Sequence, residues 1–135
     1  MDYKIVSWNV AGLRAMVKKP EFEQFINNPD NDFTIICLQE TKCEESQVKL
    51  PDYVTLKYPY RYWRSCDGTT QRKGLNGVAI WSKIQPREII TSYEFDNEGR
   101  LQIVEFDKFR LINVYTPNSQ KFQNERYYLR ECWNN

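Results

Sequence analysis

The sequence predicts an α/β domain, because two strand-like apolar runs flank a segment with helical character. Residues 3–8 are rich in β-branched and aromatic side chains, and residues 33–38 are almost wholly apolar. The second run is typical of a strand buried on both faces, as in a sheet covered by helices. The order strand, helix, strand favours a right-handed crossover between two parallel strands.

Turn and cap signals place the first helices. Gly12 marks a turn after the first strand, and we expect residues 13–18 to form a helical turn. Pro20 suits the first position of a helix with one apolar face, since proline lacks an amide hydrogen that this position does not need. The Asn-Asn-Pro-Asp sequence at 27–30 is expected to end this helix.

Further strands are predicted along the rest of the chain. Residues 77–81 and 89–95 are short apolar runs that favour strands. Residues 101–106 and 109–115 alternate apolar and polar side chains across a two-residue connection, which predicts a β-hairpin. Residues 123–133 have helical character.

Composition excludes several classes of protein. A length of 135 residues is enough for one domain with a core. A net charge of +1 argues against a protein that merely coats DNA, although a local basic edge is enough to hold a phosphate backbone. The sequence contains no histidine, so these residues cannot supply an imidazole as base, acid or metal ligand.

Cysteine usage and hydropathy bear on location. The four cysteines include no Cys-x-x-Cys pair and follow no secretory signal, so we expect free thiols in a reducing compartment. No apolar stretch approaches about 18 residues, the length that indicates a membrane helix. We therefore expect an intracellular protein, nuclear or cytoplasmic, that is neither secreted nor a membrane protein.

Polar side chains follow the predicted strands where each one ends. Asn9 follows the first strand, Glu40 the second, and Tyr115 with Asn118 the last. Ligands of helix-covered sheets gather at such strand ends, so these positions could meet in one pocket. Glu40 is the candidate metal ligand, because Mg²⁺ needs oxygen ligands and often takes only one or two carboxylates from the protein. The alternative for Glu40 is a solvated side chain beyond a strand.

The other candidates also have ordinary alternatives. Asn9 could hold a phosphate oxygen or orient a catalytic group, or it could be a turn residue before Gly12. Tyr115 could donate its hydroxyl to a phosphate oxygen in the transition state, or it could be a half-buried strand tyrosine. Eight basic residues in loops or at element ends could contact phosphates, or simply form a solvated surface: Arg14, Lys18, Lys19, Lys42, Arg72, Lys73, Arg100 and Lys121.

Four segments resemble the motifs of a known family. Residues 7–15 (SWNVAGLRA) resemble the first motif of the exonuclease III / AP-endonuclease family, and residues 37–43 (CLQETKC) resemble the second. Residues 99–106 are similar to a third segment and residues 113–118 (NVYTPN) to a fourth. The segments come in the family's order and at similar intervals, and the resemblance extends over residues 3–133.

The resemblance implies a fold of two packed sheets with helices outside. Single-domain sandwiches of this kind run to roughly 200–250 residues. We therefore expect residues 1–135 to be a truncated N-terminal part of an endonuclease/exonuclease/phosphatase domain. They would form half of a four-layered α/β sandwich, with one mixed β-sheet and flanking helices. The inner face of that sheet would then lie open, so we expect a marginal or oligomeric chain.

The resemblance also implies roles for individual residues. Glu40 would bind Mg²⁺, with Mn²⁺ as an alternative, beside the scissile phosphate of DNA. Asn9 would organise the carboxylates and the phosphate, Tyr115 would stabilise the developing charge, and Lys42 would support the carboxylate cluster. Four residues would hold the DNA backbone: Arg14, Lys19, Arg100 and Asn118.

The implied activity is that of a magnesium-dependent DNA-repair phosphodiesterase. Such an AP endonuclease and 3′–5′ exonuclease of base excision repair cleaves double-stranded DNA 5′ to an abasic site. Two family segments, Gly-Asp-x-Asn and Ser-Asp-His, do not occur here, and Ala11 stands where the family usually has Asp or Asn. We therefore expect the chain to be inactive alone and to need a separate C-terminal half.

Two other interpretations stay open at this point. The chain could be a non-catalytic remnant that binds DNA or a partner. It could also be a complete small α/β domain with a different function that shares the motifs by chance.

Overall fold

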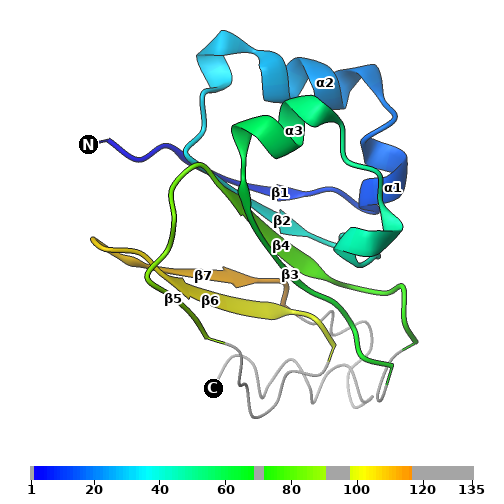
Figure 1. Cartoon of the computed structure of the whole chain (residues 1–135). Helices are drawn as coiled ribbons and strands as arrows, with labels where there is room; N and C mark the ends of the chain where they lie inside the picture. The colour runs from blue at the N-terminus through cyan, green and yellow to red at the C-terminus, as the bar shows by residue number, and fades with distance from the viewer. Residues whose placement is uncertain (1, 69–71, 91–97, 117–135) are drawn as a thin grey trace.

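The computed structural model describes residues 2–68, 72–90 and 98–116 (Figure 1). Its elements follow one another in this order: β1 (Ile5–Asn9), α1 (Leu13–Met16), α2 (Pro20–Asn27), η1 (Pro29–Asn31), β2 (Ile35–Gln39), η2 (Glu45–Gln47), α3 (Asp52–Lys57), β3 (Tyr60–Arg64), β4 (Val78–Ser82), β5 (Glu88–Ile90), β6 (Leu101–Glu105) and β7 (Arg110–Val114). Among these described elements, no helix is long and apolar enough to cross a membrane.

A four-stranded mixed sheet, sheet A, has the strand order β1-β2-β4-β3. Strands β1 and β2 are parallel and in register from Ile5 opposite Ile35 to Asn9 opposite Gln39, which confirms the predicted parallel pair. Strand β4 is antiparallel to both β2 and β3. Helix α2 begins at Pro20, as predicted. The two central strands, β2 and β4, are buried along their whole lengths.

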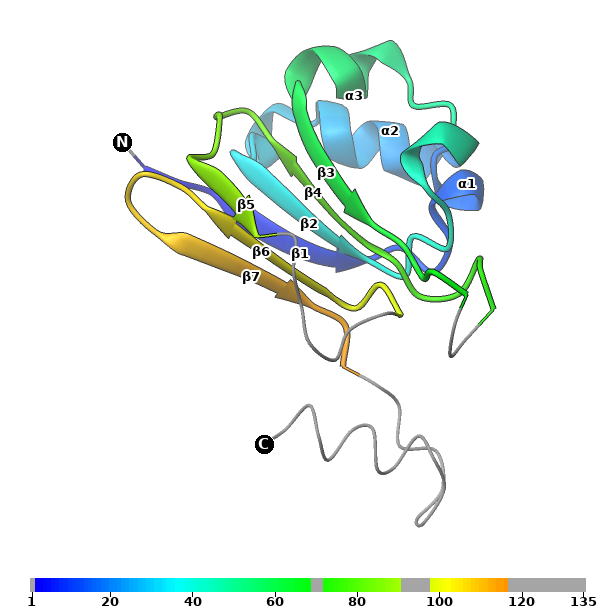
Figure 2. The ribbon, with the colours of Figure 1, turned by 60° about the horizontal axis from the view of Figure 1, so that its bottom comes forward.

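A second, antiparallel sheet, sheet B, has the order β5-β6-β7. The predicted hairpin is confirmed, since Leu101 of β6 lies opposite Val114 of β7 and Glu105 lies opposite Arg110. Figures 1 and 2 show the layers: the helices cover one face of sheet A, and sheet B covers the other.

The alternation of side chains along β2 divides the interior into two cores. Ile36 and Leu38 point to the helix side, where they pack with Phe22, Trp81 and their neighbours. Ile35 and Cys37 belong to the other core, which is formed with residues of β4 and sheet B: Ile80, Val104 and Phe106. Residues 33–38 are therefore almost all apolar because both faces of β2 are buried, one against the helices and the other against sheet B.

The α/β fold class is confirmed, but sheet B was not anticipated. The sequence predicted one mixed sheet whose inner face would lie open. That premise for oligomerisation is wrong, because the β6–β7 hairpin folds back over the inner face and leaves Ile35 and Ile80 fully buried. In the described part of the chain, the edge strands are β1 and β3 in sheet A and β5 and β7 in sheet B.

Some predicted elements differ from the structure or lie outside it. Helix α3 and strand β3 were not predicted. The predicted strand 89–95 appears as β5, Glu88–Ile90, and its continuation falls outside the described residues. The predicted helix 123–133 also lies outside them.

Candidate active site

The parallel pairing of β1 and β2 brings Asn9 and Glu40 together. Asn9 ends β1 opposite Gln39, so its side chain lies beside the residue that follows β2. Its Nδ2 donates a hydrogen bond to Oε1 of Glu40 at 2.9 Å, and its Oδ1 accepts one from the amide of Ala11 at 3.0 Å. One amide side chain thus orients both the carboxylate and the loop that leads into α1.

The loops after β1 and β2 run side by side and are joined through the backbone. The amide of Gly12 donates to the carbonyl of Glu40 at 2.7 Å, and the amide of Leu13 donates to that of Thr41 at 2.9 Å. Ala11, Glu40 and Lys42 have φ angles of 48°, 53° and 57°, in a region that non-glycine residues rarely adopt. Such backbone strain persists where surrounding contacts enforce it, and it is common at functional sites.

Gly77 holds the other side of the loop that carries Glu40. It accepts a hydrogen bond from the amide of Thr41 at 3.1 Å, and Asn76 accepts one from Lys42 at 2.8 Å. A Cβ atom at Gly77 would collide with Oγ1 of Thr41, and the φ of Gly77 is +91°. The family motifs in the sequence do not include Gly77, although its position just before an apolar strand was the available signal.

Three neighbours keep the Glu40 carboxyl ionised. Nζ of Lys42 lies 3.7 Å from Oε2 of Glu40. Burial raises the pKa of the Glu40 carboxyl, but hydrogen bonds from Asn9 and Tyr115 and the charge of Lys42 outweigh burial and hold the pKa below its ordinary value. The predicted meeting of Asn9, Glu40 and Tyr115 therefore occurs, with Lys42 beside them.

Tyr115 reaches this site from the end of β7 in sheet B, and Arg100 holds it. The Tyr115 amide donates to the carbonyl of Arg100 at 2.8 Å, and Nη1 of Arg100 donates to the carbonyl of Tyr115 at 3.3 Å. The Arg100 guanidinium also lies over the Tyr115 ring, 5.0 Å from its centroid. The positively charged guanidinium therefore lies over the face of the phenol ring.

Arg100, for which a DNA contact was predicted, is buried in the structure. The residue is 3% exposed, and its Nε donates to Oε1 of Glu98, which is also buried, at 2.7 Å. A guanidinium with so little exposed surface has little area with which to contact a DNA backbone. Its contacts in the structure are those of a residue that supports Tyr115, so the predicted DNA contact remains a prediction without structural support.

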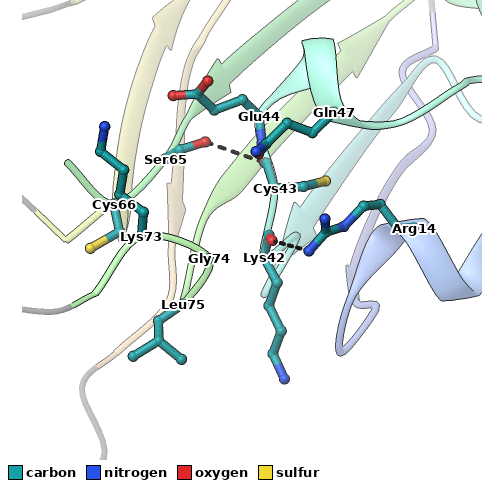
Figure 3. A pocket seen from close by; sticks show the side chains of 10 residues that line it. All are labelled: Arg14, Lys42, Cys43, Glu44, Gln47, Ser65, Cys66, Lys73, Gly74 and Leu75. Carbon is teal, nitrogen blue, oxygen red and sulfur yellow. Dashed lines mark hydrogen bonds between the residues drawn. The ribbon is translucent and has the colours of Figure 1, made fainter. Parts of the chain in front are cut away.

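A cavity of about 310 Å³ lies next to the Glu40 loop (Figure 3). Three basic residues line it, Arg14, Lys42 and Lys73, with one acidic residue, Glu44. Nη2 of Arg14 donates to the carbonyl of Lys42 at 3.3 Å, which fixes the guanidinium against the loop. An excess of cations in a concave site favours an anionic ligand such as a phosphodiester.

Of the two remaining predicted DNA contacts, the structure describes only Lys19. Lys19 is exposed at the N-cap of α2 and does not line the cavity. Asn118 lies outside the described residues. Lys73, in contrast, lines the cavity but was named beforehand only as one of eight basic residues.

The donor set suits a cation that prefers oxygen ligands, such as Mg²⁺ or Mn²⁺. Within the described ranges there is no group of three or more His, Cys, Asp or Glu residues that could hold a metal. Glu40 offers carboxylate oxygens beside the amide of Asn9. Mg²⁺ retains several waters and commonly takes one or two carboxylates plus substrate phosphate, so a single carboxylate is compatible with it.

The two packed sheets thus bring together a carboxylate, an amide and a phenol, with a cationic cavity beside them. Residues 6–131 match the model of the endonuclease/exonuclease/phosphatase family. The chain therefore belongs to this family, and chance sharing of the motifs by an unrelated small domain is excluded.

Its relatives include enzymes named for nuclease activity or DNA repair. The chain is 48% identical over 123 residues to "Recombination repair protein 1" of Drosophila melanogaster, covering 87% of this chain and 16% of the relative. It is 40% identical over 123 residues to an exodeoxyribonuclease of Bacillus subtilis, covering 87% and 44%. The solved structure of an AP endonuclease from Archaeoglobus fulgidus superimposes with a TM-score of 0.74 and 27% identity, covering 98% and 48%. The chain thus spans less than half the length of each of these relatives.

Proposed function

We propose that residues 1–135 are the N-terminal part of a metal-dependent phosphodiesterase domain that acts on DNA in base excision repair. The observation that carries the proposal is the convergence of Asn9, Glu40 and Tyr115 from two different sheets. The names of the relatives support DNA as the substrate, because they include an exodeoxyribonuclease and an AP endonuclease. Incision 5′ to an abasic site in duplex DNA is the specific reaction we propose.

Glu40 is the residue that would hold Mg²⁺, or Mn²⁺ in its place. Bound there, the ion would supply Lewis-acid stabilisation of charge on a phosphate oxygen. Asn9 orients the Glu40 carboxylate through its 2.9 Å hydrogen bond. Tyr115 carries a hydroxyl that can donate to a phosphate oxygen as its charge grows in the transition state.

The DNA backbone would lie along the cationic side of the site. Arg14, Lys42 and Lys73 line the cavity beside the Glu40 loop and could neutralise a phosphate of the strand. Lys19, exposed at the start of α2, could contact a phosphate further along the strand. Such contacts make the affinity for DNA sensitive to salt. The logarithm of the binding constant falls with the logarithm of the salt concentration, by roughly 0.9 for each neutralised phosphate.

The rest of the catalytic machinery would come from outside these 135 residues. The sequence contains no histidine, and its relatives are more than twice as long. A separate or additional C-terminal half is therefore the partner we propose, with duplex DNA as the substrate. An enzyme of DNA repair would act inside the cell, in the nucleus or cytoplasm.

The test is incision of a duplex that carries one abasic-site analogue, with and without Mg²⁺. We expect no incision by the chain alone, and Mg²⁺-dependent incision when residues corresponding to the relatives' second half are supplied with it. Glu40→Gln should abolish that incision, while Glu45→Gln, at a partly exposed carboxylate of η2 that pairs with Arg61, should not. Incision that survives Glu40→Gln would refute the metal role.

One observation favours a second candidate, binding without cleavage. The described residues of this chain form the cationic cavity by themselves, whereas the proposed catalytic set needs residues from outside the chain. A non-catalytic chain would bind an abasic duplex with salt-dependent affinity, and Arg14→Ala with Lys73→Ala would reduce both the affinity and the salt slope. Fluorescence anisotropy over a range of salt concentrations measures both quantities, and affinity that does not depend on salt would contradict it.

A further inference from the structure

A cluster of buried amide side chains joins the two sheets behind the site. Asn113 of β7, Gln39 of β2 and Gln102 of β6 are 3%, 8% and 4% exposed in an interface that is otherwise mostly apolar. We call these three residues the amide cluster. The amide cluster was not predicted from the sequence.

Asn113 is the centre of the amide cluster. Its Oδ1 accepts a hydrogen bond from Nε2 of Gln39 at 2.9 Å. Its Nδ2 lies 3.1 Å from the carbonyls of Leu38 and Ala79 and from Oε1 of Gln102. The side chain of one residue in sheet B is thus bonded to two strands of sheet A.

The other two members extend the cluster to further strands. Nε2 of Gln39 also donates to Oγ of Ser7 in β1 at 3.0 Å. Nε2 of Gln102 donates to the carbonyl of Tyr62 in β3 at 2.9 Å. The hydrogen bonds therefore reach every strand of sheet A, together with β6 and β7 of sheet B.

Two members of the amide cluster lie next to candidate active-site residues in the sequence. Gln39 immediately precedes Glu40, and Asn113 lies two residues before Tyr115. The hydrogen bond between Gln39 and Asn113 is therefore a link between the two sheets that lies close in sequence to both Glu40 and Tyr115. Apolar packing between sheets is non-directional, whereas a hydrogen bond holds only within a narrow range of distance and angle.

We propose that Asn113, with Gln39, is a positioning residue that sets the alignment of the two sheets so that the Tyr115 hydroxyl meets the Glu40 carboxylate. The meaning of this alignment for catalysis rests on the function proposed above. The alignment itself is a property of the chain alone and can be measured without DNA or metal, so its failure and the failure of the proposed function are distinguishable.

The experiment measures the coupling between Glu40 and Tyr115 by fluorine NMR of the full chain labelled with 3-fluorotyrosine. The Tyr115 signal is identified as the one lost in Tyr115→Phe. Glu40→Gln removes a charge beside the phenol, so we expect it to shift the Tyr115 signal in the parent chain. In an Asn113→Leu background, the same Glu40→Gln change should leave the Tyr115 signal unmoved, because the two groups no longer face each other.

Gln102→Leu is the matched control. It removes a buried amide from the same cluster, with the hydrogen bond that Gln102 donates to Tyr62 and the one that it accepts from Asn113, but it leaves the bond between Gln39 and Asn113 in place. Both variants should lower the melting temperature, since each leaves buried polar groups with fewer partners. Only Asn113→Leu should abolish the response of Tyr115 to Glu40→Gln, which a merely stabilising role would not do.

Asn113→Ser provides a second variant if Asn113→Leu does not fold. Its short hydroxyl can bond to a backbone carbonyl but cannot also reach Gln39 and Gln102, so the Tyr115 response should be reduced. A full response in either Asn113 variant would overturn the proposal. Loss of the response in Gln102→Leu as well, or no response in the parent chain, would also overturn it.

Discussion

Nδ2 of Asn9 donates a hydrogen bond to Oε1 of Glu40 at 2.9 Å, although 31 residues separate the two in sequence. The contact follows from the parallel register of β1 and β2, which places Asn9 opposite Gln39. The same Asn9 side chain accepts a hydrogen bond from the amide of Ala11, so it couples the carboxylate to the loop before α1.

Loss of the Asn9 amide should raise the pKa of Glu40. The hydrogen bond from Asn9 is one of the interactions that hold this pKa below its ordinary value, and Asn9→Ala removes it. A carboxyl with a depressed folded pKa contributes stability above its unfolded pKa, about 4.3, and loses it as pH falls through the folded pKa. In Asn9→Ala this contribution to stability should be smaller, and its loss should be complete at a higher pH than in the parent chain.

A carbon-13 NMR titration of the Glu40 carboxyl measures the change directly. Asn28→Ala is the control, because Asn28 also accepts a backbone hydrogen bond with its side chain but caps η1. An unchanged Glu40 pKa in Asn9→Ala would contradict the contact.

Gly77→Ala should destabilise the chain far more than Gly74→Ala. Both glycines have a φ near +90°, so both substitutions incur backbone strain of about 1–2 kcal/mol. A Cβ at Gly77 also collides with Thr41, whereas one at Gly74 meets nothing within 4 Å. Chemical denaturation should give the larger loss of unfolding free energy for Gly77→Ala, and equal losses would show that the collision is relieved at no cost.

Arg100→Met should cost much more stability than Arg110→Met. Arg100 and Glu98 form a pair whose side chains are 3% and 8% exposed, while the side chains of Arg110 and Glu105 are 57% and 29% exposed. Removing one partner of a buried pair typically costs about 3–5 kcal/mol, against about 0–1 kcal/mol for an exposed pair. Urea unfolding of the two variants checks this.

The same Arg100 variant tests its relation to the tyrosine. Because the guanidinium lies over the Tyr115 ring, Arg100→Met should also move the Tyr115 signal in a fluorine spectrum. A folded Arg100→Met chain with lower DNA affinity and an unchanged Tyr115 signal would instead favour the DNA contact that the family resemblance implies.

Ala11→Asn should stabilise the chain. Ala11 has a φ of 48°, and asparagine tolerates this left-handed conformation better than alanine does. The gain in unfolding free energy should reach up to about 1 kcal/mol. Ala15→Asn is the matched control, because Ala15 is exposed within α1, where asparagine is a poorer helix former than alanine by up to about 0.7 kcal/mol. Thermal unfolding should therefore shift in opposite directions, and a shared direction would contradict the argument.

Local patterns in the sequence were sufficient for much of the fold. The parallel pair β1 and β2, the start of α2 at Pro20 and the β6–β7 hairpin all follow from periodicity, proline and turn signals over short windows. Helix α3 and strand β3 were missed because Asp52–Lys57 and Tyr60–Arg64 have weak local periodicity. Tertiary packing of Val54 and Tyr58 into the helix-side core stabilises this region instead.

The candidate site was foreseen in part. Asn9, Glu40 and Lys42 lie in contiguous motifs at the ends of neighbouring strands, so their meeting follows from strand order and register. The burial of Arg100 was not foreseen, because a charged side chain in a sequence does not reveal whether a partner such as Glu98 will be buried with it. Lys73 was not distinguished from other basic residues, because its place in the cavity depends on how the segment before β4 folds.

The sequence by itself determined the α/β class, the family and the ends of β1 and β2 that carry Asn9 and Glu40, because these depend on neighbouring residues and recognisable motifs. Only the tertiary structure decided that sheet B covers sheet A, that Tyr115 approaches Glu40 from this second sheet and that Asn113 bonds to both sheets. The physical reason is that contacts between Gln39 and Asn113, 74 residues apart, depend on how two sheets stack. Apolar alternation specifies which face of each sheet is buried, but not which polar side chains then meet across the interface.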